Sequence, residues 1–396
     1  MKKVIFMGVF LSLAGIAGAQ SGKRALQNAY QNYSNQYYDK AKTAIDECIT
    51  YEDTKADAKT WFYRGNIYLM VEFSKSKKDS NRYKNLCDNC GEIAFDAYMK
   101  AFEIDPKLEV PGMVGLSTIQ AGLKNCSDIL VNESIDAINK QDYERAYLLA
   151  QKACKADGEK ENAIYCMGLT AELLKKTDEA KSNYDKLVKS KSKTMPPYVR
   201  LALIYQTEDD KPNAVKVMEE GANIFLNDTA FDVKYAEAYA FIMLWAGNSK
   251  DGIAIAEKAL KRNPKSYTML VSVGTKLTEN KKYEDAEDFL KRALEIESDD
   301  IVANYNLGFC YFQNALDKFE EQNNVPLNDN ESYERLKAEG NALLEKAMPY
   351  VEKAHELDPN DKHTLTMLQK IYARIEGKTE ERKATEEKLQ ELKKNE

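Results

Sequence analysis

Histidine is scarce in this chain. Only two of the 396 residues are histidine, His355 and His363. Neither lies near a nucleophile in a pattern that would suggest a catalytic triad. No glycine-rich segment follows a predicted strand, so a phosphate-binding loop is not indicated. The many carboxylates fall on charged helix faces, where solvation explains them. We therefore expect no enzyme activity, no cofactor and no metal site.

An excess of basic residues is also missing. The chain carries 57 Lys and Arg against 64 Asp and Glu, which gives a formal net charge of −7. An acidic protein with interspersed charges is a poor candidate for binding nucleic acid. Beyond the N-terminal segment, no apolar run approaches the ~20 residues that a membrane-spanning helix needs. We therefore expect no integral membrane segment in the mature protein.

Residues 1–19 predict a secretory signal peptide. A short basic start precedes an apolar stretch from Val4 to Ala19, and Ala17 with Ala19 fits a small-x-small cleavage pattern. An uncleaved anchor is the alternative, but the stretch is short and contains three glycines. No cysteine stands at the cleavage site, which argues against a lipoprotein. We expect cleavage before Gln20 and a periplasmic protein, which a partner could hold at the outer membrane.

Small and large apolar residues recur at fixed spacing on predicted helices. Small residues let two antiparallel helices approach closely, and large residues three and four positions away fill the adjoining groove. A period near 34 residues is typical of a helix–turn–helix solenoid. The clearest copies are Ala94, Tyr98 and Ala101; Ala180, Tyr184 and Leu187; and Ala286, Leu290 and Ala293.

One stretch carries a fuller signature. Trp61, Arg64, Gly65 and Tyr68, and then Ala94, Tyr98, Ala101 and Pro106, resemble the tetratricopeptide repeat (TPR) pattern W-x2-L-G-x2-Y … A-x3-F-x2-A-x4-P. The resemblance extends over nearly the whole mature chain. It implies an all-α, right-handed superhelical solenoid of TPR helix-turn-helix repeats, which binds a protein or peptide partner along an extended surface.

The repeats are interrupted in three places. N-terminal repeats are predicted over 20–110, with an insertion at about 71–90. Residues 111–126 form either a hinge or an extra helix. Further repeats are predicted over 127–361, with a second insertion at about 315–341, and capping helices over 362–396.

In a TPR array, residues of the first helix of each pair line the inner face. Here they give an apolar, aromatic lining, which predicts a groove for a peptide or an amphipathic helix. The alternative is that these rings pack against neighbouring helices. A carboxylate clamp is rejected, because Phe62 stands where a lysine would be needed. The predicted groove residues are Phe62, Asn66, Tyr165, Leu169, Phe241, Trp245, Tyr305, Phe309 and Phe312.

Cys87 and Cys90 form a Cys-x-x-Cys sequence in the first insertion, and the chain has seven cysteines in all. A local disulfide is the favoured interpretation, with free thiols as the alternative. Half of a zinc site would need two further ligands. A redox pair is also less favoured, since it would be expected to begin a helix beside a sheet.

The sequence thus favours an exported scaffold or adaptor that binds a protein or peptide in cell-envelope assembly or transport. It resembles secreted TPR proteins of Gram-negative Bacteroidetes, and Asp228-Thr229-Ala230 makes Thr229 a candidate for O-glycosylation. A glycan-binding protein on a TPR scaffold and a regulatory subunit of an envelope enzyme complex are the alternatives. The partner and the oligomeric state stay open.

Overall fold

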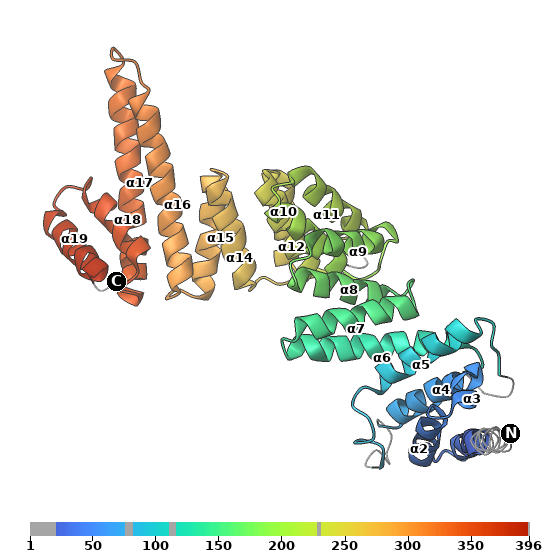
Figure 1. Cartoon of the computed structure of the whole chain (residues 1–396). Helices are drawn as coiled ribbons and strands as arrows, with labels where there is room; N and C mark the ends of the chain where they lie inside the picture. Colours follow the sequence, from blue (N-terminus) through green and yellow to red (C-terminus); the bar gives the residue numbers. More distant parts are fainter. Residues whose placement is uncertain (1–20, 76–81, 111–115, 228–230, 395–396) are drawn as a thin grey trace, which may run out of the picture. The chain divides into compact units, whose positions relative to one another are not determined.

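A computed structural model of the chain is shown in Figure 1, and it describes residues 21–75, 82–110, 116–227 and 231–394. The signal-peptide prediction and Thr229 lie outside these ranges. Within them the regular elements are helical, and extended pairing is limited to one bridge between Glu109 and Thr118. None of the described helices combines the length and apolar character that a membrane span requires. The chain divides into two compact units between Ser192 and Lys193.

The first unit is a series of antiparallel helix pairs. Helix α4 packs against α5, α6 against α7, and α8 against α9, and the first helices α4, α6 and α8 contact one another in turn. The elements are a helix over 21–34, α2 (Tyr38–Cys48), α3 (Glu52–Lys55), α4 (Ala58–Ser74), α5 (Cys90–Ile104), α6 (Ile119–Asn139), α7 (Tyr143–Ala156), α8 (Glu161–Leu173) and α9 (Thr177–Lys189).

The second unit continues the same construction. Its pairs are α10 with α11, α12 with α13, α14 with α15, α16 with α17, and α18 with α19. The helices are α10 (Pro196–Thr207), α11 (Lys211–Phe225), α12 (Val233–Ala246), α13 (Ser249–Leu260), α14 (Tyr267–Glu279), α15 (Tyr283–Ile296), α16 (Ile301–Asn323), α17 (Asn330–Leu357), α18 (Lys362–Tyr372) and α19 (Thr379–Lys394).

The predicted small residues lie where the paired helices cross. A Cβ atom at Gly65 would stand 2.7 Å from the Tyr98 ring, and one at Gly274 would stand 2.6 Å from Leu290. Real Cβ atoms do not approach so closely, so glycine permits the approach. In each case the glycine lies on the first helix of a pair and the large residue on the second, as the repeat signature requires. These contacts confirm the all-α solenoid of TPR-type pairs.

The turns inside the pairs repeat as well. Gln141, Lys175 and Asp209 have φ angles of 62°, 58° and 55°, although none of them is glycine. Positions 141, 175 and 209 are 34 residues apart, which is the length of a TPR unit. The shared left-handed residue closes the first helix and lets the second helix run back along it.

Two segments differ from the sequence prediction. The insertion at about 315–341 consists mostly of helix, because α16 and α17 both continue through it and form the long hairpin of Figure 1. Residues 111–126 are predicted to be a hinge or an extra helix, and within them residues 119–126 are helical, because α6 begins at Ile119 and not at 127. Gly122 packs on the Tyr98 ring and so occupies a helix-crossing position. Residues 119–126 are therefore the start of a first helix.

Candidate functional site

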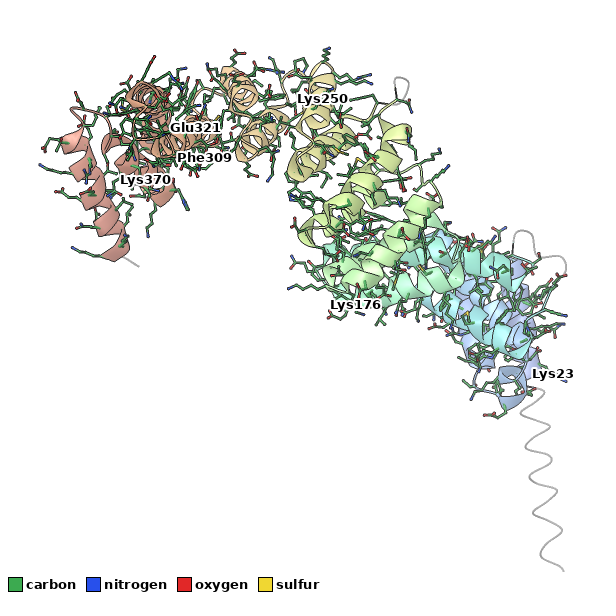
Figure 2. The ribbon with its side chains drawn as sticks, turned by 90° about the horizontal axis from the view of Figure 1, so that it is seen from above. Lys23, Lys176, Lys250, Phe309, Glu321 and Lys370 are labelled. Carbon is green, nitrogen blue, oxygen red and sulfur yellow. The ribbon has the colours of Figure 1, made fainter. Side chains whose placement is uncertain are left out.

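The second unit carries a surface built by the first helices of four pairs. We call this surface of α12, α14, α16 and α18 the first-helix face. Neighbouring helices of this set contact each other in the order α12, α14, α16, α18, so the face is continuous. Figure 2 shows Phe309 of α16 and Lys370 of α18 on one side of the unit, away from Lys250 of the second helix α13.

The larger hollow on this face lies where α16 meets the start of α18. Its volume is about 420 Å³. Ile301 and Val302 line it, and they keep 39% and 52% of their surface exposed. The polar rim is formed by the start of α18, where Asp361 accepts hydrogen bonds from the backbone of the next turn. Apolar side chains together with a few polar groups are the usual lining of a binding site.

Two aromatic side chains extend the apolar surface along α16. The rings of Tyr305 and Phe309 are stacked, with centroids 6.1 Å apart and planes inclined by only 7°. Both residues are half-buried. Burial raises the pKa of Tyr305, so its hydroxyl stays neutral. The pair presents a partly exposed aromatic surface on α16, the helix that also carries Ile301 and Val302.

A smaller hollow, of about 160 Å³, lies between α12 and α14. Phe241 lines it together with Met269 and Val273, and Glu237 supplies an acidic edge. The Lys276 ammonium lies 5.4 Å from the Phe241 ring centroid, within the range of a cation–π contact. One turn further along α12, Trp245 is half-buried in the same way, with the Lys211 ammonium 5.5 Å from its ring.

Three of the predicted groove residues are buried instead, and their assignment to a groove is wrong. Phe62 is fully buried, with its ring edge against Tyr98 at a centroid distance of 6.0 Å. Asn66 is also fully buried, and its side-chain oxygen accepts a hydrogen bond from the Tyr98 hydroxyl. Phe312 retains only 5% exposure. Its spacing of four from Gly308 places it on the packing face, and this signal distinguishes it from Phe309.

The remaining two predicted residues belong to the first unit. Tyr165 and Leu169 lie half-buried on α8, and the Tyr165 ring is tilted against Tyr184 at a centroid distance of 6.0 Å. They therefore form no part of the first-helix face, which contains Phe241, Trp245 and the Tyr305–Phe309 pair.

The cysteines do not follow the favoured interpretation. All seven lie in the described ranges and all seven are free thiols, so the predicted Cys87–Cys90 disulfide is not formed. Cys90 begins helix α5, at the end of the predicted insertion at about 71–90. In the described part of the chain, no three His, Cys, Asp or Glu side chains are grouped to hold a metal ion.

No family model and no curated protein matches the chain. The solved structures with similarity include a TPR protein, YrrB, described as having an unusual peptide-binding site (15% identity, 53% of this chain and 96% of that one, TM-score 0.38). MamA from Desulfovibrio magneticus RS-1 is similar at 18% identity (51% and 94%, TM-score 0.36). PilF from Pseudomonas aeruginosa is similar at 14% identity (64% and 100%, TM-score 0.43). Independently of these likenesses, the helix pairing, the recurring turns and the glycine contacts identify the fold as an array of TPR-type helix pairs.

Proposed function

We propose that this chain is a protein-interaction scaffold that holds a peptide segment with apolar anchors on the first-helix face of the second unit. The stacked Tyr305–Phe309 pair beside the exposed Ile301 and Val302 carries the proposal. Single exposed apolar residues are ordinary, but a stacked aromatic pair next to a hollow lined by both apolar and polar side chains is typical of an interaction site.

The expected energetics fit a peptide ligand. Full burial of an aromatic ring removes ~150–250 Å² from water. Tyr305 and Phe309 are already half-buried, so a partner gains roughly half of that area at each ring. At ~25 cal/mol per Å² this gives about 2–3 kcal/mol per ring before the costs of association. The peptide therefore needs two or three apolar side chains to form a specific complex. They must be spaced so that they lie on one face of an extended strand or of a helix.

The test compares two phenylalanines on one helix. We expect Phe309→Ala to weaken binding of a selected peptide by at least ~30-fold, since truncated hot-spot residues typically cost ~2 kcal/mol or more. Its melting temperature should change little. Phe312→Ala, the matched control, should instead lower the stability of the second unit by ~3–5 kcal/mol, because Phe312 is part of the core.

Peptides for this test are selected from a displayed random library on the wild-type protein, after depletion on the Trp245→Ala/Phe309→Ala double variant. Dissociation constants are then measured by calorimetry. Failure to select any peptide, or equal affinity for wild type and Phe309→Ala, would contradict the proposal. Retention of polysaccharide in place of peptides would favour the glycan-binding alternative.

We further infer that the scaffold is exported and acts in cell-envelope assembly or transport. The basic start and apolar stretch of residues 1–19 support this inference. Mass spectrometry of the native protein should find a chain that starts at Gln20, in its free or cyclised form. Recovery of a chain that still begins with Met1 would refute export by a cleaved signal.

A further inference from the structure

Cys87 and Cys90 lie at the start of helix α5 in the first unit, and neither belongs to the first-helix face. Cys90 is the first residue of this 15-residue helix and is fully buried, whereas Cys87 is only half-buried. The Cys90 sulfur lies 3.5 Å from the carbonyl oxygen of Cys87. The pair therefore combines one accessible and one inaccessible thiol, three residues apart, at the positive end of a helix dipole.

The surroundings favour a thiolate at the accessible cysteine. The hydrogen bond with Cys90 lowers the pKa of Cys87, and the Lys75 ammonium acts in the same direction. Lys75 itself is held by Glu72 at 2.6 Å. In contrast, the same hydrogen bond and burial raise the pKa of the Cys90 thiol. Lowered pKa values at helix starts and in Cys-x-x-Cys sequences distinguish reactive thiols from inert buried ones.

A hollow of about 410 Å³ adjoins the pair. Asp88 and Asn89, the two residues between the cysteines, belong to its lining, although the cysteines themselves do not. The rest of the lining carries both charges and two apolar side chains, from Glu133, Asp136, Ala137, Lys140, Asp142, Arg145 and Leu149. The hollow is open and of mixed polarity, and it has room for a segment of another polypeptide. Of the five remaining cysteines, four are buried and only Cys154 is half-buried like Cys87. Burial raises the pKa of Cys154 to about 11, so this thiol differs from Cys87 in its ionisation and not in its access.

We propose that Cys87 and Cys90 form a thiol–disulfide exchange site that acts on a disulfide in a polypeptide segment docked beside Asp88 and Asn89. The Cys87 thiolate attacks one sulfur of that disulfide. The substrate S–S bond breaks, a mixed disulfide forms at Cys87, and the second substrate sulfur leaves as a thiolate.

Cys90 completes the exchange. It loses its proton and attacks the Cys87 sulfur, so that the Cys87–Cys90 disulfide forms and the first substrate sulfur leaves. Two electrons have then passed from the pair to the substrate disulfide. One substrate thiolate takes the proton that Cys90 releases, and the other takes from water the proton that Cys87 gave up when it ionised. The substrate is the only oxidant that the step requires. The roles are unequal, because only Cys87 can be reached from outside.

The experiment uses the reduced full-length protein, with Cys154 as the internal control. At pH 7 we expect iodoacetamide to alkylate Cys87 at least tenfold faster than Cys154, as measured by peptide mass spectrometry. With oxidised glutathione as the disulfide probe, Cys90→Ser should accumulate a mixed disulfide at Cys87. Cys87→Ser should not accumulate one at Cys90, and Cys154→Ser should behave as wild type.

Equilibration of the wild type with glutathione mixtures separates an exchange site from a structural disulfide. An exchange site should convert between dithiol and disulfide as the ratio of reduced to oxidised glutathione is varied. A structural disulfide should stay oxidised at every ratio. Persistent oxidation, or alkylation of Cys87 no faster than that of Cys154, would overturn the proposal. Both of these measurements need no variant, so they decide the question even if Cys90→Ser does not fold.

Discussion

Replacement of Tyr98 by alanine is expected to lower the free energy of unfolding of the first unit by about 3–5 kcal/mol. Tyr98 is fully buried, and its ring contacts both Gly65 of α4 and Gly122 of α6. A single side chain thus fills the space where three helices meet. Glycines on either side cannot move in to close the cavity without moving whole helices, so relaxation should be slight.

Tyr98→Phe is the matched control for this prediction. It keeps the ring but removes the hydroxyl that donates a hydrogen bond to Asn66. Asn66 is itself fully buried, so its side-chain oxygen would lose that donor at a cost of about 1–3 kcal/mol. The expected order of stability is wild type, then Tyr98→Phe, then Tyr98→Ala.

The two tryptophans allow each unit to be followed separately. Trp61 lies on α4 in the first unit and Trp245 on α12 in the second. Urea unfolding is therefore measured by fluorescence in Trp245→Phe and Trp61→Phe backgrounds, since a repeat array need not unfold in one step. In the Tyr98 variants, the unfolding transition reported by Trp61 should have its midpoint at a lower urea concentration. An unchanged Trp61 transition would show that Tyr98 is not the centre of this packing.

The helix pairs could be predicted because the repeat signature fixes which residues of its two helices meet. Gly65 of α4 and Tyr98 of α5 occupy a small and a large position of that signature, and they are in contact in the structure. The length of the α16–α17 hairpin was missed for the opposite reason. Its extra turns contact mainly each other, as Phe319 does with Gly340, and so they fall outside the repeat pattern.

The candidate site was only partly predictable, because exposure depends on what the neighbouring helix provides. Phe309 and Phe312 are three residues apart, yet one is half-buried and the other is in the core. Asn66 has a polar side chain typical of a surface, but the Tyr98 hydroxyl, 32 residues away, binds it inside the core. Such long-range partners leave no mark on the local sequence.

The second large effect concerns Glu133, a half-buried acid on α6. Burial raises the pKa of Glu133 from 4.5 to about 7, and the nearby Glu72 and Glu92 act in the same direction. The backbone N–H of Gly91 and the Arg145 guanidinium oppose this shift. One oxygen of Glu133 has no hydrogen-bond partner among the described residues. The ionised form is therefore poorly compensated in the folded protein.

The sign of the pH dependence follows from this shift. Between pH 4.5 and about 7 the unfolded chain releases the Glu133 proton while the folded chain retains it, so stability falls as the pH rises. Above about pH 7 the full penalty is present. At about 1.4 kcal/mol per pH unit, it amounts to about 3 kcal/mol.

Glu133→Gln removes this ionisation and keeps an oxygen for the Gly91 N–H. We expect it to stabilise the first unit by about 2–3 kcal/mol at pH 8 and to have almost no effect at pH 4.5. Glu92→Gln is the control of opposite sign, because hydrogen bonds from Arg145 and Lys152 lower the pKa of Glu92 to about 2. It should destabilise by ~1 kcal/mol, with a similar deficit at pH 5 and pH 8. Urea unfolding followed through Trp61 measures both variants. A Glu133→Gln protein that is less stable than wild type at pH 8 would show that the Glu133 carboxylate is favourably held in the fold.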